Sequence, residues 1–352
     1  MSRKKILFVG WVNYGKKPVC GETTKNQYIL AELEKYCDVK VLDFYNKKAH
    51  PWIYAQAAWA FFTEPNATIV FSTSAQNVYS FLKLLKKIGL KRNIIHWVIG
   101  GAFATYVKNG RYDAEVFKNV NFNLVQCKGM ITELEEAGVM NAKFVSNFKP
   151  INYYPDLTEC QKKRDESGKI RFVFMSRIMF DKGCDYIIKA VEELNKKGLQ
   201  EKFIVDFYGK VDAPYKKIFE PKVESISNVT YKGLLDLKSS AGYDTLATYH
   251  AMLFPSFWRG EGFAGIFIDA YISGLPIFAS DWAHNNEGVI DGKTGVLYPV
   301  HDVKALIDVM ERTINGEYDL QAMSACCRAE APKYQADLAV NEDYLRSIGL
   351  VD

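Results

Sequence analysis

The stretch FVFMSRIMFDKGCDYIIKAVEEL, residues 172–194, decides the fold of the second half of the chain. It opens on four apolar residues, the length of a short buried strand, and it closes on residues 184–194, whose apolar side chains recur at helical spacing. The polar turn 176–183 separates the two. A strand, a turn and a helix form the repeating unit of a parallel sheet covered by helices, so the stretch predicts an α/β architecture.

Short apolar runs alternate with longer amphipathic runs along the whole chain, as this unit requires. In the first half we expect strands at Ile6–Gly10, Val39–Phe44, Thr68–Ser72, Ile94–Ile99, Phe122–Gln126 and Lys143–Ser146. In the second half we expect them at Arg171–Met175, Phe203–Tyr208, Val229–Lys232, Met252–Pro255, Ile277–Ser280 and Val296–Tyr298. Helices are expected at Thr24–Tyr36, Val78–Ile88, Ile131–Ala137, Cys184–Lys196, Phe263–Ile272, Val303–Ile314 and along a long C-terminal stretch. The pattern predicts two doubly wound parallel sheets of similar size.

A polar segment with two prolines, Asn147–Lys169, separates the two halves and predicts a linker. The 352 residues fit two domains at roughly 100–200 residues each. We therefore expect one domain over residues 1–150 and a second over residues 165–330. Ligands of doubly wound sheets bind beyond the carboxyl ends of the strands, so the chemistry is expected just after each strand.

The composition predicts a cytoplasmic protein. No apolar run approaches the about 18 residues of a membrane-spanning helix. The N-terminus, Met1–Lys5, leads directly into the apolar run Ile6–Val9, which is too short for a signal peptide. The seven cysteines are odd in number and lack a C-x-x-C pair, so we expect free thiols in a reducing compartment.

Charge is unevenly divided between the two halves. Residues 1–160 hold 21 Lys and Arg against 13 Asp and Glu, a net of +8, and the remainder holds 24 against 28, a net of −4. The excess predicts either an anionic partner of the first half or only a solvated surface. Within it, Val78–Ile88 is flanked by lysines and could lie on an anionic membrane, or pack on the sheet with its lysines in water. No basic stripe with interleaved aromatic residues occurs, so nucleic acid is not an expected partner.

The turn after the strand Arg171–Met175 has the composition of an anion-binding site. Arg177 and Lys182 supply two cations, and the helix that follows offers free N–H groups and a partial positive charge. Together these groups would neutralise a diphosphate. An exposed loop with ordinary surface charges is the alternative.

A second loop, residues 257–265, follows the strand Met252–Pro255 and carries glycines at 260, 262 and 265. Glycine lets the backbone approach a ligand closely, and the loop leads into another helix N-terminus. Glu261 precedes that helix and Asp269 lies within it. Carboxylates there could accept hydrogen bonds from the hydroxyls of a sugar and a ribose. The alternative is a tight turn with one buried capping acid.

Two further loops complete the second half. Gly233 and Leu234 end a strand, where an exposed backbone could hydrogen-bond the edge of a nucleobase, or form only an ordinary turn. The stretch Asp291–Gly295 is typical of a structural turn.

With these motifs in order, residues 170–315 resemble the family 4 glycosyltransferases. The resemblance rests on residues 172–194, on LFPSFWRGEGFAGIFIDAYISGLPIFASD at 253–281 and on EGVIDGKTGVLYPVHDVKALIDVM at 287–310. It implies a retaining enzyme of the GT-B fold, in which two Rossmann-like doubly wound domains face each other across a cleft. It also implies that a C-terminal helix at about 330–352 crosses back to the first domain.

The resemblance assigns roles to the motif residues. Arg177 and Lys182 are expected to bind the donor diphosphate, and Glu261 the donor sugar; these three are the expected catalytic residues. Asp269 stands where the family has a glutamate that binds ribose, one methylene longer, which puts the ribose contact in doubt. The other expected donor-binding residues of this half are Ser176, Gly233, Leu234, Gly262, Phe263 and Ala264. Glu287 matches a glutamate commonly found after the Ser280-Asp281 strand end.

The first half resembles the bacterial surface-polysaccharide branch of the family. Gly21 and Thr23 fit its G-x-T pattern after the first strand, and Gly100 with Gly101 stands where many members carry a histidine. These four residues are expected to lie at the donor. His96 falls inside an expected strand, so we expect it to be packed rather than catalytic.

The resemblance implies a hexosyltransferase that uses a nucleoside-diphosphate sugar, with UDP favoured over GDP. The expected acceptor is a saccharide or a lipid-pyrophosphate-linked saccharide in polysaccharide, glycan or capsule biosynthesis. No Asp-x-Asp motif occurs, so no metal or other cofactor is expected. A peripheral position on the inner face of the plasma membrane accompanies the membrane hypothesis. Two alternatives stay open: a non-catalytic regulatory or scaffold subunit of the same fold, and a sugar-nucleotide epimerase.

Overall fold

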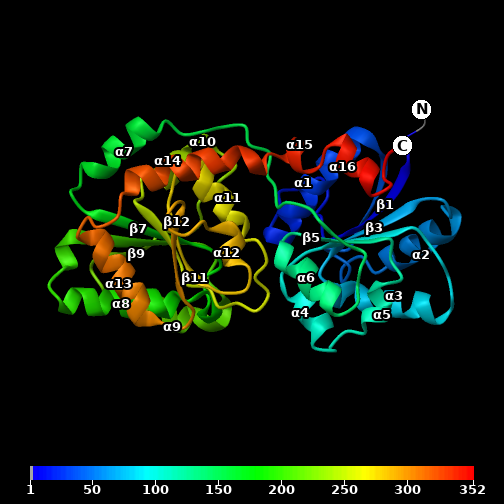
Figure 1. The fold of residues 1–352 in the computed structure, drawn as a ribbon, viewed down its shortest axis with the longest axis horizontal. Coiled ribbons are helices and arrows are strands. Elements are labelled where there is room, and N and C mark those ends of the chain that lie inside the picture. The colour runs from blue at the N-terminus through cyan, green and yellow to red at the C-terminus, as the bar shows by residue number, and fades with distance from the viewer. Residues whose placement is uncertain (1–2) are drawn as a thin grey trace. The chain divides into compact units, whose positions relative to one another are not determined.

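A computed structural model describes residues 3–352, so Met1 and Ser2 of the expected N-terminal segment lie outside the described residues. The chain divides into two compact units (Figure 1). Unit 1 comprises Met1–Pro150 and Tyr334–Asp352, and unit 2 comprises Ile151–Lys333. Each unit has its own sheet and its own buried core.

Unit 1 has six parallel strands in the order β2-β1-β3-β4-β5-β6. The strands are β1 (Lys5–Gly10), β2 (Asp38–Asp43), β3 (Thr68–Thr73), β4 (Ile94–Val98), β5 (Phe122–Val125) and β6 (Ala142–Phe144). The helices α1 (Gly21–Tyr36) and α16 (Glu342–Ser347) cover one face (Figure 1). The other face carries α3 (Ala75–Lys87), α4 (Ala102–Lys108), α5 (Ala114–Phe117) and α6 (Lys128–Glu136). Two further helices are α2 (Ile53–Thr63) and α15 (Ala336–Ala339).

Unit 2 has six parallel strands in the order β12-β11-β10-β7-β8-β9. They are β7 (Ile170–Met175), β8 (Phe203–Tyr208), β9 (Val229–Tyr231), β10 (Ala251–Phe254), β11 (Ile277–Asp281) and β12 (Gly295–Pro299). The helices α8 (Cys184–Lys196), α9 (Ala213–Glu224) and α13 (Val303–Ile314) cover one face, and α7 (Leu157–Asp165), α10 (Ser240–Ala247), α11 (Gly265–Ile272) and α14 (Leu320–Glu330) the other. Short helical turns are η1 (Phe180–Lys182), η2 (Gln200–Lys202), α12 (Asn285–Gly288) and η3 (Ala331–Tyr334).

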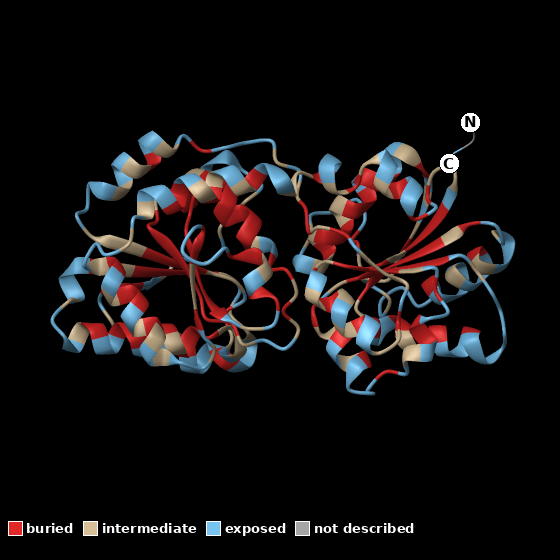
Figure 2. Ribbon diagram, in the orientation of Figure 1, coloured by how far each residue is buried: buried red, intermediate tan, exposed pale blue. Residues whose placement is uncertain are grey.

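The predicted α/β fold with two doubly wound parallel sheets is confirmed, and a strand lies at each of the twelve expected places. Residues of the central strands are buried on both sheet faces, whereas the helices expose their outer sides (Figure 2). Burial on both faces explains why the strands appear in the sequence as short continuous apolar runs. All seven cysteines are free, as expected.

The expected linker at 147–169 is wrong, because much of it is structured as part of unit 2. Helix α7 lies within it, and Asp156 caps this helix by accepting hydrogen bonds from the backbone N–H groups of Thr158 and Glu159. Cys160 is buried, and Gln161 donates to the hydroxyl of Ser324. The prolines and polar residues of this segment are typical of a linker. Asp156, however, is a residue type that favours the N-cap of a helix.

The long helix expected at the C-terminus is broken into α14, η3, α15 and α16, and the last part belongs to unit 1. Val340, Leu345, Ile348 and Leu350 are buried in the same cluster as the apolar residues of α1 and β1. The N–H of Lys149 donates to the carbonyl of Tyr334 at 3.0 Å, where this segment begins. The core of unit 1 is therefore built from both ends of the chain.

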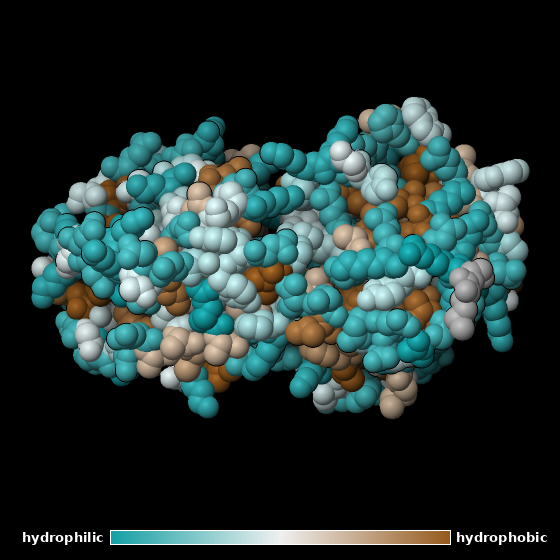
Figure 3. Space-filling model, turned by 90° about the horizontal axis from the view of Figure 1, so that it is seen from above, coloured by the Kyte–Doolittle hydropathy of each residue, from teal (hydrophilic) through white to brown (hydrophobic). Residues whose placement is uncertain are grey.

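In residues 3–352 no helix combines the length and hydrophobicity that crossing a bilayer requires. On the face seen in Figure 3, hydrophilic residues cover most of the surface and hydrophobic residues form separate patches.

The C-terminal segment should contribute to the stability of unit 1. Leu345→Ala removes a fully buried side chain, so we expect it to lower the free energy of unfolding by about 2–5 kcal/mol. The control Leu338→Ala removes a side chain that is 61% exposed and should cost less than about 0.5 kcal/mol. Hydrogen exchange resolved by peptide would show the loss in unit 1; equal effects of the two substitutions would contradict this packing.

Candidate active site

The direction in which successive strands are added reverses between β7 and β10 of unit 2. From β7 the chain continues to β8 and β9 on one side, while β10, β11 and β12 lie on the other. The strands β7 and β10 are neighbours, and the connections that leave them run in opposite directions. Such a switch point is where ligands bind in open α/β sheets. The two motif loops found in the sequence begin at these two strands.

These two loops approach each other closely. The N–H of Phe257, in the loop after β10, donates to the carbonyl of Asp181 at 2.9 Å. Gly183 has a φ of +75°, and a Cβ there would lie 2.7 Å from Cγ of Pro255 and closer still to its carbonyl oxygen. Only glycine combines this backbone conformation with this approach, so Gly183 allows the loops to meet.

Lys182 and Glu261 form an ion pair where the loops meet. The Nζ–carboxylate distance is 2.5 Å, and the side chains are only 12% and 9% exposed. The hydroxyl of Ser256 donates to the same carboxylate at 2.6 Å, and the hydroxyl of Ser280 donates to the carbonyl of Ser256 at 2.6 Å. An ammonium group has three N–H donors, so Lys182 can hold Glu261 and still donate to an anion.

Arg177 lies on the other side of the same turn and is exposed. The backbone beside it is fixed, because the N–H of Ser176 donates to Tyr208 at 3.2 Å and the N–H of Ile178 donates to Lys210 at 3.0 Å. The guanidinium is therefore presented to solvent from a rigid segment, as a group that binds an anion would be.

Gly209 brings the loops after β7, β8 and β9 together. Its φ is +143°, and a Cβ would lie 2.8 Å from the carbonyl carbon of Ser176 and closer to the oxygen. Its N–H donates to the carbonyl of Gly233 at 2.8 Å. The structure thus joins Ser176 to Gly233 through one residue that the sequence analysis did not select. Leu234 follows and is 75% exposed.

The loop before α11 contains the three expected backbone donors. The helix starts at Gly265, two residues later than expected, so Gly262, Phe263 and Ala264 belong to the loop. Phe263 and Ala264 are buried there, and the helix presents its N-terminal N–H groups at this edge of the sheet.

Asp269 lies inside unit 2 rather than at its surface. Its side chain is buried, and the hydroxyl of Tyr243 from α10 donates to one carboxylate oxygen at 2.8 Å. The sequence analysis missed Tyr243, because a single tyrosine in a helix carries no motif.

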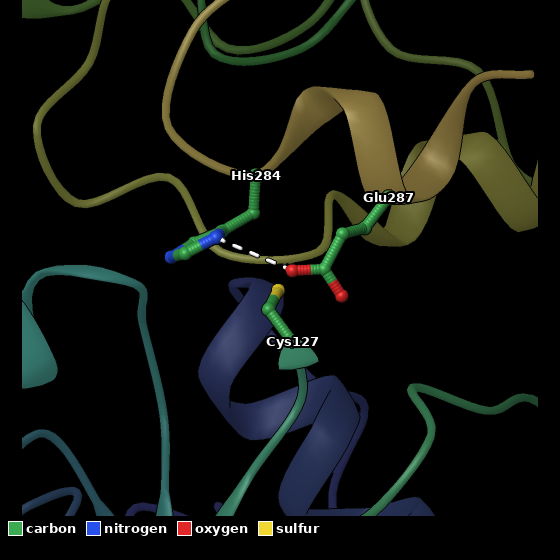
Figure 4. A group of neighbouring side chains, drawn as sticks. All are labelled: Cys127, His284 and Glu287. Atoms are coloured by element: carbon green, nitrogen blue, oxygen red, sulfur yellow. Dashed lines mark ion pairs between the residues drawn. The ribbon is translucent and has the colours of Figure 1, made fainter. Parts of the chain in front are cut away.

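His284 and Glu287 point toward each other at the end of β11 (Figure 4). Nδ1 of His284 lies 3.5 Å from the Glu287 carboxylate, and Cys127, drawn in the same figure, belongs to unit 1. The stretch after them is structural, as expected, because Asp291 accepts a hydrogen bond from the N–H of Leu297 and Gly292 has a φ of +70°.

Unit 1 has its own switch point, between β1 and β3. Glu22, at the start of α1, accepts a hydrogen bond from the hydroxyl of Thr73 at 2.9 Å, and Asn77 donates to that hydroxyl at 2.8 Å. Burial raises the pKa of Glu22 above its ordinary value, and the Thr73 hydrogen bond opposes that rise. A partly desolvated carboxylate at a switch point is suited to accept hydrogen bonds from hydroxyl groups. Sequence reasoning missed it because its partners come from β3 and α3.

The expected residues of unit 1 have different environments. Gly21 is exposed at the first position of α1, whereas Thr23 is fully buried. The Thr23 hydroxyl accepts hydrogen bonds from the N–H groups of Val19 and Cys20 and donates to the Cys20 carbonyl. The Thr23 hydroxyl is therefore used in capping α1. This arrangement does not favour the expected contact between Thr23 and the donor.

Gly100 and Gly101 form the turn between β4 and α4. Gly100 is exposed with a φ of +95°, and Gly101 is the N-cap residue of α4.

Two basic side chains near this sheet are buried. Burial lowers the pKa of His96 to about 4, and its Nε2 lies 3.2 Å from the carbonyl of Thr73, so the expectation that it is packed is confirmed. Burial also lowers the pKa of Lys25 well below its ordinary range, and Lys25 donates to the amide oxygen of Asn147 at 2.6 Å.

Comparison with known proteins identifies a family for residues 169–315 and relatives that match part of the chain. The family described as "Glycosyl transferases group 1" matches residues 169–315. An uncharacterized 41.2 kDa protein in the cps region of Klebsiella pneumoniae is 27% identical over 155 residues, which cover 44% of this chain and 40% of that protein. The 2-deoxystreptamine N-acetyl-D-glucosaminyltransferase of Niallia circulans is 24% identical over 220 residues, 60% of this chain and 54% of the enzyme. The chain thus spans about half the length of the curated relatives it matches.

Solved structures resemble the whole chain. Anabaena Alr3699/HepE in complex with UDP-glucose superposes with a TM-score of 0.70 at 15% identity, covering 98% of this chain and 99% of that one. At this identity the likeness concerns the fold, and it confirms the predicted GT-B fold.

The close approach at Gly183 can be tested against a matched glycine. Gly183→Ala and Gly198→Ala both place a side chain on a left-handed residue, with φ of +75° and +78°, but no atom lies within 4 Å of a Cβ at Gly198. We expect Gly198→Ala to cost about 1–2 kcal/mol of unfolding free energy. Gly183→Ala should cost about 1–3 kcal/mol more, because the methyl group overlaps Pro255. Urea unfolding measures both, and equal costs would show that the loops do not meet as described.

Proposed function

We propose that this chain, whose residues 169–315 form a domain of the group 1 glycosyl transferases, transfers a sugar from a nucleotide-sugar donor to an acceptor. The observation that carries the proposal is the Lys182–Glu261 pair at the switch point of unit 2. The Lys182 ammonium suits a phosphate and the Glu261 carboxylate suits a sugar hydroxyl. The two groups are hydrogen-bonded to each other. A site for a nucleoside-diphosphate sugar needs these two chemistries side by side.

In this proposal the donor lies along the loops of unit 2. Arg177, Lys182 and the N-terminus of α8 hold the diphosphate, as opposite charge and free N–H groups favour. Glu261 accepts hydrogen bonds from the sugar. The backbone of Gly233 and Leu234 holds the base. These assignments follow the family resemblance and agree with the exposure of Arg177 and Leu234.

The ribose contact is a finer part of the proposal. Asp269 is buried with one oxygen held by Tyr243, so its carboxylate is oriented before any ligand binds. We propose that Tyr243 orients Asp269 and that the ribose hydroxyls reach it directly or through a water molecule.

Transfer would proceed by electrostatic stabilisation of the leaving group. The bond between the anomeric carbon and the diphosphate oxygen breaks, and its electron pair stays on the nucleoside diphosphate. Arg177 and Lys182 stabilise that charge in place of a metal ion. The acceptor oxygen bonds to the anomeric carbon on the same face, so the configuration is retained, and its proton passes to a leaving diphosphate oxygen.

The preferred donor is proposed to carry UDP. One observation supports this nucleotide: the structure of Anabaena Alr3699/HepE was solved in complex with UDP-glucose. The acceptor is proposed to be a saccharide or a lipid-linked saccharide of polysaccharide or capsule synthesis, since one relative comes from a cps region. Within unit 1, Glu22 is proposed to accept the hydrogen bond of an acceptor hydroxyl.

A nucleotide-binding panel tests the proposed donor site. UDP, GDP, ADP and TDP are added to the wild type, Arg177→Ala and Arg312→Ala, and the thermal shift is recorded. A ligand at 100 times its dissociation constant should stabilise the wild type by about 2.7 kcal/mol. We expect the largest shift with UDP. Arg177→Ala removes a charge-assisted hydrogen bond worth about 1.5–3 kcal/mol. We therefore expect its affinity for UDP to be roughly 10- to 150-fold lower than that of the wild type.

Arg312 is the matched control, because it lies on the outer helix α13 and its guanidinium pairs with Glu317, which follows that helix. Its variant should bind like the wild type. No shift with any nucleotide would contradict the proposal and favour the non-catalytic subunit instead.

A further inference from the structure

Helix α2 in unit 1 is apolar yet exposed. Its sequence, IYAQAAWAFFT, has no charged residue, and only Ile53 and Ala60 are buried. Trp59 is 70% exposed and Phe62 75%, and Trp52 and Tyr54 at the start of the helix are 58% and 56% exposed. A helix that is hydrophobic on all sides is normally covered by protein or lipid. The sequence analysis did not select α2, because it lacks both charge and an amphipathic period.

The exposed apolar residues of α2 continue onto α3. Phe81, Leu84 and Ile88 recur at intervals of three and four residues, so they form one stripe of α3, and all three are exposed. Leu82 and Leu85 are buried, which shows that α3 packs on the sheet with its other face. The packing alternative stated for this segment therefore describes one face of α3, and the other face is apolar and exposed.

Aromatic contacts join the two helices into one surface. The rings of Phe61 and Phe62 lie 5.6 Å apart, and those of Phe61 and Phe81 5.9 Å apart. Arg92 stacks over Phe61 at 4.4 Å and donates hydrogen bonds to carbonyls at the end of α2. We call Trp59, Phe62, Phe81, Leu84 and Ile88, with Trp52 and Tyr54, the α2–α3 surface. Exposed apolar residues gathered on two helices that contact each other mark a candidate interaction site.

The surroundings of the α2–α3 surface are basic. Residues 44–92 contain seven Lys and Arg and one acidic residue, Glu64. That carboxylate is already paired with Lys5 at 2.9 Å. Lys48, Lys83, Lys87 and Lys91 are exposed beside the apolar residues. A partner must therefore be apolar at its centre and negative at its edge.

We propose that the α2–α3 surface docks on an anionic phospholipid bilayer, with α2 lying in the interface and the lysines on the lipid head groups. A bilayer supplies both required chemistries, because Trp, Tyr and Phe partition into the head-group boundary and each nearby lysine is attracted to anionic lipid. An acidic protein would satisfy the lysines but would leave the uncharged face of α2 without a matching apolar partner. The inference does not depend on the proposed transferase activity.

Vesicle flotation of the full chain tests the proposal. Phosphatidylcholine vesicles with phosphatidylglycerol are compared with phosphatidylcholine alone, at low and high salt. We expect binding to the anionic vesicles that salt weakens, because exposed charges are screened. Trp59→Gln with Phe62→Gln should lower the bound fraction at least tenfold. Lys83→Glu with Lys87→Glu should lower binding to anionic vesicles by a similar factor.

The matched control is Leu338→Gln, which replaces another exposed apolar residue of unit 1 outside the surface. It should float like the wild type, and unchanged unfolding of every variant shows that the fold is intact. Equal flotation of the wild type and the Trp59/Phe62 variant would overturn the proposal. A second result would also overturn it. If sedimentation shows that the wild type is a dimer that does not float, and the Trp59/Phe62 variant is a monomer, then a second copy of the chain covers the surface.

Discussion

The structure of unit 2 depends on the close approach of two loops at a switch point. The neighbouring strands β7 and β10 send their connections in opposite directions, and ligands of open α/β sheets bind beyond the carboxyl ends of such strands. Gly183 lets the loop after β7 contact Pro255, and this contact brings Lys182 to Glu261. The paired charges are largely buried, so removing one partner would be costly, and the Ser256 hydroxyl donates a second hydrogen bond to the carboxylate. The roles proposed for Lys182 and Glu261 follow from this arrangement.

The same topology serves different chemistry in the two units. In unit 2 the switch point holds cations and helix N-termini, which suit a diphosphate. In unit 1 it holds Glu22 with Thr73 and Asn77, a set of hydroxyl, amide and carboxylate groups that suits a neutral polyol. Unit 1 also carries the basic excess of the chain and the apolar residues of α2. Donor, acceptor and membrane are thus proposed to meet separate surfaces, each with its own chemistry.

The fold could be predicted from the sequence because strands buried on both faces must be apolar and short, as the central strands β3, β4 and β10 are. The motif loops could be found for a related reason, since Arg177, Lys182 and Glu261 stand directly after strands. Side chains whose roles depend on distant partners could not be found. Tyr243 matters only because α10 packs beside α11, and Glu22 only because β3 lies next to β1. Helix α2 was not predicted, because a uniformly apolar helix has no hydrophobic period. Helix α7 was not predicted, because its neighbouring prolines and polar residues are typical of a linker.

The most direct test of the central claim is calorimetric binding of UDP and of a UDP-sugar to the wild type, Lys182→Met and Glu261→Gln. UDP-glucose and UDP-N-acetylglucosamine serve as probes, and the tighter of the two is used. The account predicts that Lys182→Met weakens both UDP and the UDP-sugar at least tenfold, because both carry the diphosphate. It predicts that Glu261→Gln weakens the UDP-sugar and leaves UDP nearly unchanged, because only the sugar contacts the carboxylate. UDP binding that is insensitive to Lys182→Met would contradict it.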